Sequence, residues 1–128
     1  MHTVLIVDDS VTARRVVRRE LERLGHHVVE ASNGEDALVS LSQQAPALVI
    51  SDVNMGPMDG LTLLANIRRT FSAAQLPVLM LTTEAGDDLK ARGRVLGATG
   101  WLVKPFEPER MGAVITHVLT SRSRGTRP

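Results

Sequence analysis

The chain alternates short apolar runs with segments long enough for a helix, and no other feature of the sequence constrains its fold as strongly. The runs lie at Thr3–Val7, His27–Ala31, Ala47–Ser51, Pro77–Leu81 and Gly100–Val103. The first, third and fourth lack polar alternation, which is typical of strands covered on both faces. Strands that alternate with helices through short connections form parallel sheets. The sequence therefore predicts an α/β fold, with a single doubly wound five-stranded parallel sheet in a three-layer sandwich.

Five segments carry the apolar spacing or the end signals of helices. We expect these helices at about Ser10–Leu24, Glu35–Gln44, Asp59–Phe71, Gly86–Leu96 and Pro108–Leu119. Gly25 is suited to end the first helix, and Asp59 is suited to cap the third. The fourth is the weakest, because Gly93 lies in its interior at a cost of about 1 kcal/mol relative to alanine. It is either a loosely packed surface helix or a segment kept mobile for switching.

Length and composition limit the classes of protein to which the chain can belong. Its 128 residues suit one domain, which we expect over residues 1–121, with a polar basic tail over residues 122–128. The absence of cysteine excludes disulfides and zinc–thiolate sites. A net charge of +1 and only 2% aromatic residues argue against a nucleic-acid reader. The apolar runs are far shorter than the roughly 20 residues of a membrane span, so we expect a cytoplasmic protein without membrane insertion.

Polar residues follow the apolar runs, at the points where the strands should end. Asp8 and Asp9 follow the first run, and Asp52 follows the third. Thr82 follows the fourth run and Lys104 follows the fifth. Because the carboxyl ends of parallel strands meet at one edge of a sheet, we expect these carboxylates, the hydroxyl and the ammonium to converge there. Ligands of such sheets bind at this edge, so it is the candidate functional site.

The predicted cluster has the composition of a cation site. Three carboxylates and one lysine carry a combined charge of −2, which favours a bound divalent cation. Oxygen ligands without a dedicated protein cage favour Mg²⁺ over Ca²⁺. The alternative is that Asp8, Asp9 and Asp52 are separate turn or cap residues, which are common after strands. Their coincidence with a lysine and a threonine favours the cation site.

A cation, a lysine and a hydroxyl together suit phosphoryl transfer. They would stabilise the negative charge on the phosphoryl oxygens while one carboxylate attacks phosphorus. Asp52 is the candidate nucleophile, because the loop after it leaves its side chain open to a donor. Two other classes fit less well. A flavin-binding electron carrier shares the layout but lacks three acids with a lysine, and the DVN sequence at Asp52 lacks the second acid that the DxD pattern of metal-dependent phosphatases requires.

Several motifs of the chain resemble the receiver domain of bacterial two-component response regulators. They are VDDS (Val7–Ser10), SDVNM (Ser51–Met55), MDG (Met58–Gly60), LTTE (Leu81–Glu84) and GATGWLVKPF (Gly97–Phe106). The resemblance extends over residues 3–120. Within the family, the LTTE and GATGWLVKPF segments resemble stand-alone chemotaxis regulators of the CheY type. It implies the flavodoxin-like strand order 2-1-3-4-5, which flavodoxin and CheY share.

The resemblance implies roles for the acids of the predicted cluster. Asp52 would accept a phosphoryl group from a phosphohistidine of a sensor histidine kinase. Mg²⁺ would be bound by the side chains of Asp9 and Asp52 and by the backbone carbonyl of Asn54. Asp8 would act on the cation through water.

The resemblance also implies how phosphorylation is sensed. Lys104 would pair with the phosphoryl oxygens, and its peptide bond to Pro105 would be cis. Thr82 would turn inward and draw the switch residue Trp101 after it. The signal would then pass through the surface of the fourth helix, the fifth strand and the fifth helix.

Asn54 and Glu84 occupy the two positions that, in this family, help to set how long the phosphorylated state lasts. Their combination implies a short-lived state. Two features depart from the common pattern of the family. Gly56 stands where proline is common, with Pro57 one place later, and tryptophan stands where tyrosine or phenylalanine is common. Trp101 is therefore either the switch residue or a packing residue at the edge of the core.

The implied partners are those of a signalling domain that assists only its own phosphorylation and dephosphorylation. They are a sensor histidine kinase of the CheA type, a downstream protein such as a flagellar motor switch or a kinase, and a phosphatase. Chemotaxis is the pathway that the resemblance favours. A relay intermediate and a regulator of a non-motility output are the alternatives.

Five arginines gather on the first predicted helix, at Arg14, Arg15, Arg18, Arg19 and Arg23. They form either a solvated face partly balanced by Glu20 and Glu22, or a docking surface for the kinase or its phosphohistidine domain.

Overall fold

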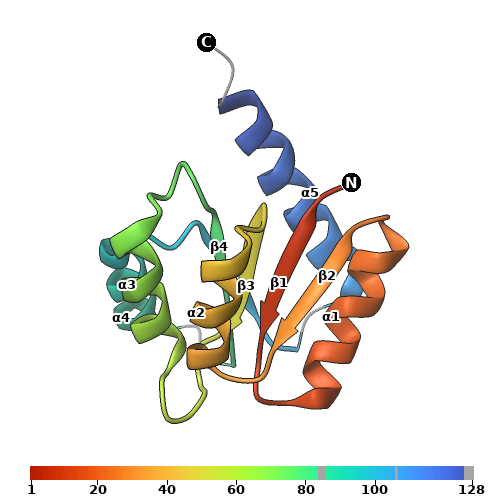
Figure 1. The fold of residues 1–128 in the computed structure, drawn as a ribbon. Helices are drawn as coiled ribbons and strands as arrows, with labels where there is room; N and C mark the ends of the chain where they lie inside the picture. Colours follow the sequence, from red (N-terminus) through yellow and green to blue (C-terminus); the bar gives the residue numbers. More distant parts are fainter. Residues whose placement is uncertain (84–85, 106, 126–128) are drawn as a thin grey trace.

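Five strands alternate with five helices in the computed structural model, within the residues that it describes, 1–83, 86–105 and 107–125 (Figure 1). The strands are β1 (Thr3–Val7), β2 (His27–Ala31), β3 (Leu48–Asp52), β4 (Val78–Thr82) and β5 (Gly100–Val103). The helices are α1 (Val11–Arg23), α2 (Gly34–Gln43), α3 (Gly60–Thr70), α4 (Asp87–Leu96) and α5 (Pro108–Gly125). Each predicted element is present, with ends that mostly differ by one or two residues.

The strands form one parallel sheet in the order β2-β1-β3-β4-β5. This confirms the doubly wound fold and the flavodoxin-like strand order. Val7 at the end of β1 is in register with Ala31 of β2 and Ser51 of β3. Asp52 at the end of β3 is in register with Leu81 of β4. The carboxyl ends of neighbouring strands are therefore level with one another, and the polar residues that follow them share one edge of the sheet.

Helices cover both faces of the sheet, with α1 and α5 on one face and α2, α3 and α4 on the other (Figure 1). Alternate strand residues supply two separate cores. Ile6 of β1 packs under α1 and α5, whereas its neighbours Leu5 and Val7 pack on the α2 and α3 side. Among the described residues, no helix combines the length and apolarity that a membrane span requires.

Side-chain caps fix where the helices near the predicted site begin. Ser10 accepts a hydrogen bond from the backbone N–H of Ala13 at 3.1 Å, which starts α1 immediately after Asp8 and Asp9. Asp59 caps α3 as predicted. The short β1–α1 link therefore holds the two acids between a buried strand and a capped helix.

Three elements continue past their predicted C-terminal ends. β3 includes Asp52 and β4 includes Thr82, because backbone pairing continues past the apolar runs, with the N–H of Val53 donating to the carbonyl of Leu81 at 2.9 Å. α5 continues from its predicted end at Leu119 to Gly125, into the segment assigned to the polar basic tail. No proline or glycine stands between Leu119 and Gly125 to end that helix at its last apolar residue.

α4 is held to the rest of the fold by little packing. Of its residues only Gly93 is buried, and Val95 is 87% exposed. A methyl group at Gly93 would overlap the indole ring of Trp101, so the glycine that weakens the helix makes the space in which this ring lies. This packing agrees with the prediction of a loosely packed surface helix. That α4 is mobile for switching stays a prediction.

Candidate functional site

The three predicted acids converge at the carboxyl edge of the sheet. One carboxylate oxygen from each of Asp8, Asp9 and Asp52 lies within 4.8 Å of the other two. Asp8 and Asp52 are buried, whereas Asp9 is exposed to solvent. They come from the β1–α1 link and the end of β3, which are neighbours because β1 pairs with β3. We refer to Asp8, Asp9, Asp52 and Lys104 as the acidic pocket.

Both carboxylate oxygens of Asp8 have partners. Oδ1 accepts a hydrogen bond from the backbone N–H of Ser10 at 2.9 Å, and Oδ2 lies 3.1 Å from the Nζ atom of Lys104. The backbone N–H of Asp8 also donates to the carbonyl of Ala31 on β2 at 3.2 Å. Asp8 is therefore fixed in the pocket by polar contacts to α1, β2 and the residue that follows β5.

Asp52 is fixed less tightly. Its Oδ1 atom lies 3.4 Å from Nζ of Lys104, and its side chain accepts a hydrogen bond from the backbone N–H of Asn54. Gly60 of the MDG motif lets α3 begin against this strand end, because a methyl group there would overlap the backbone oxygen of Asp52. The N–H of Gly60 donates to the carbonyl of Val53 at 2.8 Å. The loop between Asp52 and α3 is thus closed by backbone contacts, while the carboxylate stays at the pocket.

The electrostatic balance of the acidic pocket is incomplete. Burial raises the pKa of the Asp52 carboxyl, and the nearby carboxylate of Asp8 raises it further. Lys104 and the N–H of Asn54 lower this pKa, but they do not cancel the two stronger effects. Three carboxylates and one ammonium leave a charge of −2, and the ligand atoms on offer are oxygens. This set of donors fits a hard divalent cation.

Lys104 reaches two of the acids from the end of β5. Its backbone N–H donates to the carbonyl of Thr82 at 2.7 Å, which places it beside the end of β4. The Lys104–Pro105 peptide bond is cis, as the resemblance implied. The Gly56–Pro57 bond in the loop after β3 is also cis, which the sequence did not lead us to expect.

Three other predicted site residues lie on β4, on β5 and in the loop after β3. Thr82 is completely buried at the end of β4. Trp101 is half-buried on β5, where its ring lies against Gly93 of α4. Asn54 is exposed in the loop after β3. Glu84 and the Phe106 of the GATGWLVKPF motif lie outside the described residues.

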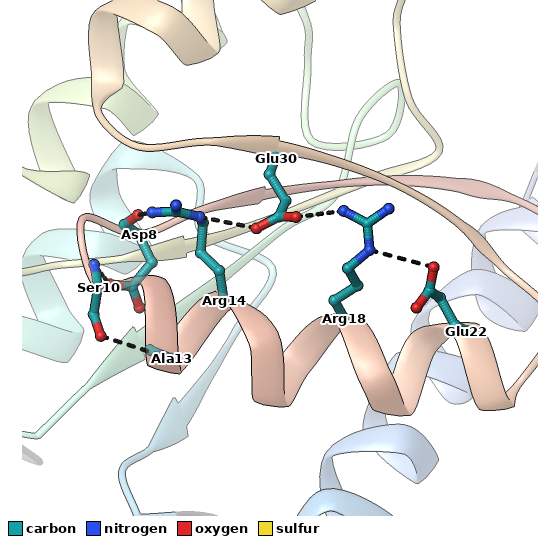
Figure 2. Close-up of polar contacts among 7 residues, drawn as sticks. All are labelled: Asp8, Ser10, Ala13, Arg14, Arg18, Glu22 and Glu30. Atoms are coloured by element: carbon teal, nitrogen blue, oxygen red, sulfur yellow. Dashed lines mark hydrogen bonds and ion pairs between the residues drawn. The ribbon is translucent and has the colours of Figure 1, made fainter.

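The arginine-rich face of α1 is largely neutralised by carboxylates. Glu30 of β2 accepts from Nε of Arg14 at 2.9 Å and also pairs with Arg18 (Figure 2). Nε of Arg18 donates to Oε2 of Glu22 at 3.2 Å. Although burial raises the pKa of Glu30, the hydrogen bonds from the two arginines leave it below its ordinary value. Of the two acids expected to balance this face, Glu22 pairs with Arg18 and Glu20 pairs with Arg23. Arg15 and Arg19 are exposed.

Sequence reasoning missed one connection to the pocket. Nη1 of Arg14 donates to the backbone carbonyl of Asp8 at 2.6 Å (Figure 2). The signal for its partner was present in the sequence, because Glu30 is an acid inside the otherwise apolar HVVEA strand. A carboxylate on the side of a strand that faces a helix is partly desolvated, so a cationic side chain on that helix is expected to pair with it.

Comparison with known proteins points to one family. Residues 4–116 match the family described as "Response regulator receiver domain". Protein PilG of Pseudomonas aeruginosa is 35% identical over 116 residues, which cover 90% of this chain and 86% of PilG. Among solved structures, chemotaxis protein CheY4 of Vibrio cholerae superposes with a TM-score of 0.87 at 40% identity, over 92% of this chain and 98% of CheY4.

Longer proteins also match. The protein named "Probable transcriptional regulator ycf27" from Porphyra purpurea is 35% identical over 91% of this chain, and its counterpart from Pyropia yezoensis matches equally well. This chain spans 46% of the length of each of these two relatives.

Proposed function

The chain belongs to the response regulator receiver domain family, and from this premise we propose that Asp52 accepts a phosphoryl group from a phosphohistidine of a sensor histidine kinase. Members of this family are phosphoacceptor signalling modules rather than catalytic enzymes. The observation that carries the proposal is the acidic pocket itself. It gathers three carboxylates within 4.8 Å and sets the Lys104 ammonium 3.4 Å from the Asp52 carboxylate.

The pocket residues would hold Mg²⁺ through the side chains of Asp9 and Asp52 and the backbone carbonyl of Asn54, with Asp8 acting through water. When bound, the cation would neutralise charge on the transferring phosphoryl oxygens. This requirement agrees with the incomplete charge balance of the pocket and with the all-oxygen donor set.

The transfer step uses one oxygen of Asp52 as the nucleophile. The Asp52 carboxylate attacks phosphorus, a P–O bond forms, and the P–N bond of the phosphohistidine breaks. The electron pair of that bond stays on the imidazole nitrogen, which then takes up a proton. Lys104 pairs with the phosphoryl oxygens and stabilises their charge. Hydrolysis reverses the modification, with water attacking phosphorus and Asp52 leaving as a carboxylate.

The phosphoryl group changes the surface formed by α4, β5 and α5. Thr82 turns toward the phosphoryl oxygens, and Trp101 follows as the switch residue. The packing of Trp101 on Gly93 supports this coupling, because Gly93 is the only buried residue of α4. If the Trp101 ring moved away, α4 would lose the contact that covers this residue. Phosphorylation then shifts an equilibrium between two surfaces that bind different partners.

Chemotaxis is the pathway that the relatives support, through CheY4 at 40% identity. The output would be a flagellar motor switch or a kinase in the cytoplasm, and a phosphatase would shorten the signal. A regulator of a non-motility output is the second candidate, since the longer ycf27 proteins are named as transcriptional regulators. A relay intermediate that passes the phosphoryl group onward is the third.

Asn54 and Glu84 are proposed to give the phosphorylated state a short life. Following the loss of the phosphoryl group after the donor is removed measures this directly. Decay within minutes is expected, and persistence over many hours would contradict it.

The α1 face is proposed to dock the kinase through Arg19, one of its exposed arginines. Charge reversal in Arg19→Glu should slow transfer from a phosphorylated kinase and leave phosphorylation by acetyl phosphate unchanged. Equal rates of transfer from the kinase to the native chain and the variant would refute docking there.

The modified residue can be located by chemical trapping. The chain is incubated with acetyl phosphate and Mg²⁺ and then reduced with borohydride, which converts an aspartyl phosphate to homoserine. Peptide mass spectrometry is expected to find homoserine at position 52. Homoserine at position 8 or 9, or at no position, would contradict the assignment of Asp52.

A further inference from the structure

Arg14 connects the acidic pocket to a pair of charges outside it. Its Nη1 atom donates to the backbone carbonyl of Asp8 at 2.6 Å, and its Nε atom donates to Oε1 of Glu30 at 2.9 Å (Figure 2). The other carboxylate oxygen of Glu30 pairs with Arg18. The side chain of Arg14 is only 15% exposed, so these contacts are made in a partly desolvated setting.

The sequence places Arg14 there for reasons of local geometry. It lies one turn into α1, where its N–H donates to the carbonyl of the capping residue Ser10 at 3.0 Å. Side chains on a helix lean toward its N-terminus, so the guanidinium extends back over the β1–α1 link. Glu30 faces α1 because the alternate residue Val28 packs in the core beneath α1 and α5. The strand therefore supplies a carboxylate where the guanidinium arrives.

The carbonyl that Arg14 holds belongs to the peptide that joins Asp8 to Asp9. The Asp8 side chain has contacts of its own to Ser10 and Lys104, whereas Asp9 is exposed. The direction of the Asp9 side chain depends on the orientation of this peptide. Residues that hold metal ligands in place without touching the metal are often as necessary as the ligands.

We propose that Arg14, itself held by Glu30, is a positioning residue that fixes the Asp8–Asp9 peptide so that the Asp9 carboxylate faces Asp52 and a divalent cation. This inference rests on the proposed function, because it assigns Arg14 a part in forming the cation site. The charge of Arg14 works in the opposite direction, since a guanidinium beside the pocket repels a cation. Positioning and charge therefore predict opposite effects when Arg14 is replaced by a neutral residue.

The test measures Mg²⁺ affinity by titration calorimetry on the full chain, without any phosphoryl donor. Arg14→Met is expected to weaken Mg²⁺ binding about tenfold, in the range typical for residues that support metal ligands. Arg15→Met is the matched control, because it removes the same charge from an exposed neighbour on the same helix. It is expected to leave the affinity unchanged or slightly tighter.

Glu30→Met alone should weaken Mg²⁺ binding on either explanation, because it removes a negative charge and leaves Arg14 without its anchor. We expect this loss to be smaller than the loss of about tenfold in Arg14→Met. Of the two Glu30 variants, only the one that combines both substitutions separates the two explanations, since charge alone would predict an affinity near that of the native chain. The double variant restores the charge balance but is expected to bind as weakly as Arg14→Met alone, since Glu30 acts through Arg14.

A second readout uses the metal-free chain. In nitrogen-15 NMR spectra, the amide of Asp9 reports a hydrogen bond to the carbonyl of the same peptide. Arg14→Met is expected to shift the Asp9 amide, and Arg15→Met is expected to leave it in place. A folded Arg14→Met chain with an unshifted Asp9 amide, or with Mg²⁺ affinity equal to or tighter than the control, would overturn the inference alone. A native chain that binds no Mg²⁺ would overturn the proposed cation site together with it.

Discussion

The acidic pocket and helix α4 are held in the fold by different kinds of contact. In the pocket, directed polar contacts fix the atoms, as when Asp8 receives a hydrogen bond from Ser10 and an ion pair from Lys104. α4 instead rests on packing, with Gly93 against the ring of Trp101 as its only buried residue. The proposed function explains this difference, because chemistry at phosphorus would require atoms in fixed places, whereas a signalling surface would have to move at low cost.

The two ends of α4 also differ. At its start, Gly86 provides no side-chain cap. At its end, Gly97 adopts a left-handed conformation with a φ of 93°, and its carbonyl accepts hydrogen bonds from Arg68 of α3 at 2.8 and 3.0 Å. The same guanidinium donates to the carbonyl of Leu76 at 2.7 Å. Among the residues that the structure describes, the helix is therefore anchored at the end far from the acidic pocket and has no such clamp at the near end.

The largest expected effect comes from breaking this anchor. Burial lowers the pKa of Arg68, which is satisfied by backbone carbonyls rather than by a carboxylate. Arg68→Met would leave buried carbonyls without donors and should lower the free energy of unfolding by about 3 kcal/mol. Urea denaturation measures this change. Arg69→Met, at the exposed neighbouring position, should change stability by less than about 0.5 kcal/mol.

A smaller loss is expected where α4 meets β5. Gly93→Ala places a methyl group against the indole of Trp101, and overpacking of this kind costs about 1–3 kcal/mol, partly offset by the better helix propensity of alanine. The fluorescence of Trp101, the only tryptophan, should shift because its ring must move. The matched variant Gly86→Ala meets open space and should leave the spectrum unchanged. Equal spectra for Gly93→Ala and the native chain would show that the ring does not rest on α4.

The pocket is expected to respond to pH rather than to packing. The pKa of Asp52 is raised in the folded chain, so ionised Asp52 destabilises the metal-free protein at neutral pH. This cost disappears as the pH falls through the raised pKa toward the ordinary value. Asp52→Asn should therefore stabilise the metal-free chain at pH 7, by on the order of 1 kcal/mol, and the gain should vanish in acid.

Thermal unfolding of the native chain and the Asp52→Asn variant across this pH range measures the effect. Asp88→Asn, on the exposed surface of α4, is the control. A gain that is the same at acidic and neutral pH would show that the ionisation of Asp52 is not its cause.

The smallest expected effect is at the exposed end of the row of ion pairs that links Arg14, Glu30, Arg18 and Glu22. The pair of Arg18 with Glu22 spans 3.2 Å between side chains that are 39% and 53% exposed. Glu22→Gln should lower the free energy of unfolding by less than about 0.5 kcal/mol, and this difference should shrink in salt. A loss of several kcal/mol in urea denaturation would mean that the exposed ion pairs of α1 contribute strongly to the free energy of unfolding.

The sequence predicted the pocket because strand ends of a parallel sheet must meet, and Asp8, Asp9, Asp52 and Lys104 directly follow strand-like runs or end them. The fold followed from the same alternation. The contacts of Arg14 with Asp8 and Glu30 were not predicted from the sequence. They join a helix to an edge strand, and no sequence motif links two side chains at this separation along the chain. The role of Gly93 was also hidden, since local propensity shows only the cost of a glycine and not the indole ring that needs its space.

The proposed function requires a single carboxylate that can be phosphorylated at the acidic pocket. Intact-mass spectrometry after incubation with acetyl phosphate and Mg²⁺ tests this most directly, with the native chain and Asp52→Asn measured side by side. One added phosphoryl group is expected on the native chain, none on the native chain when Mg²⁺ is chelated before the donor is added, and none on Asp52→Asn. An unmodified native chain, or a variant that gains the same mass, would contradict it.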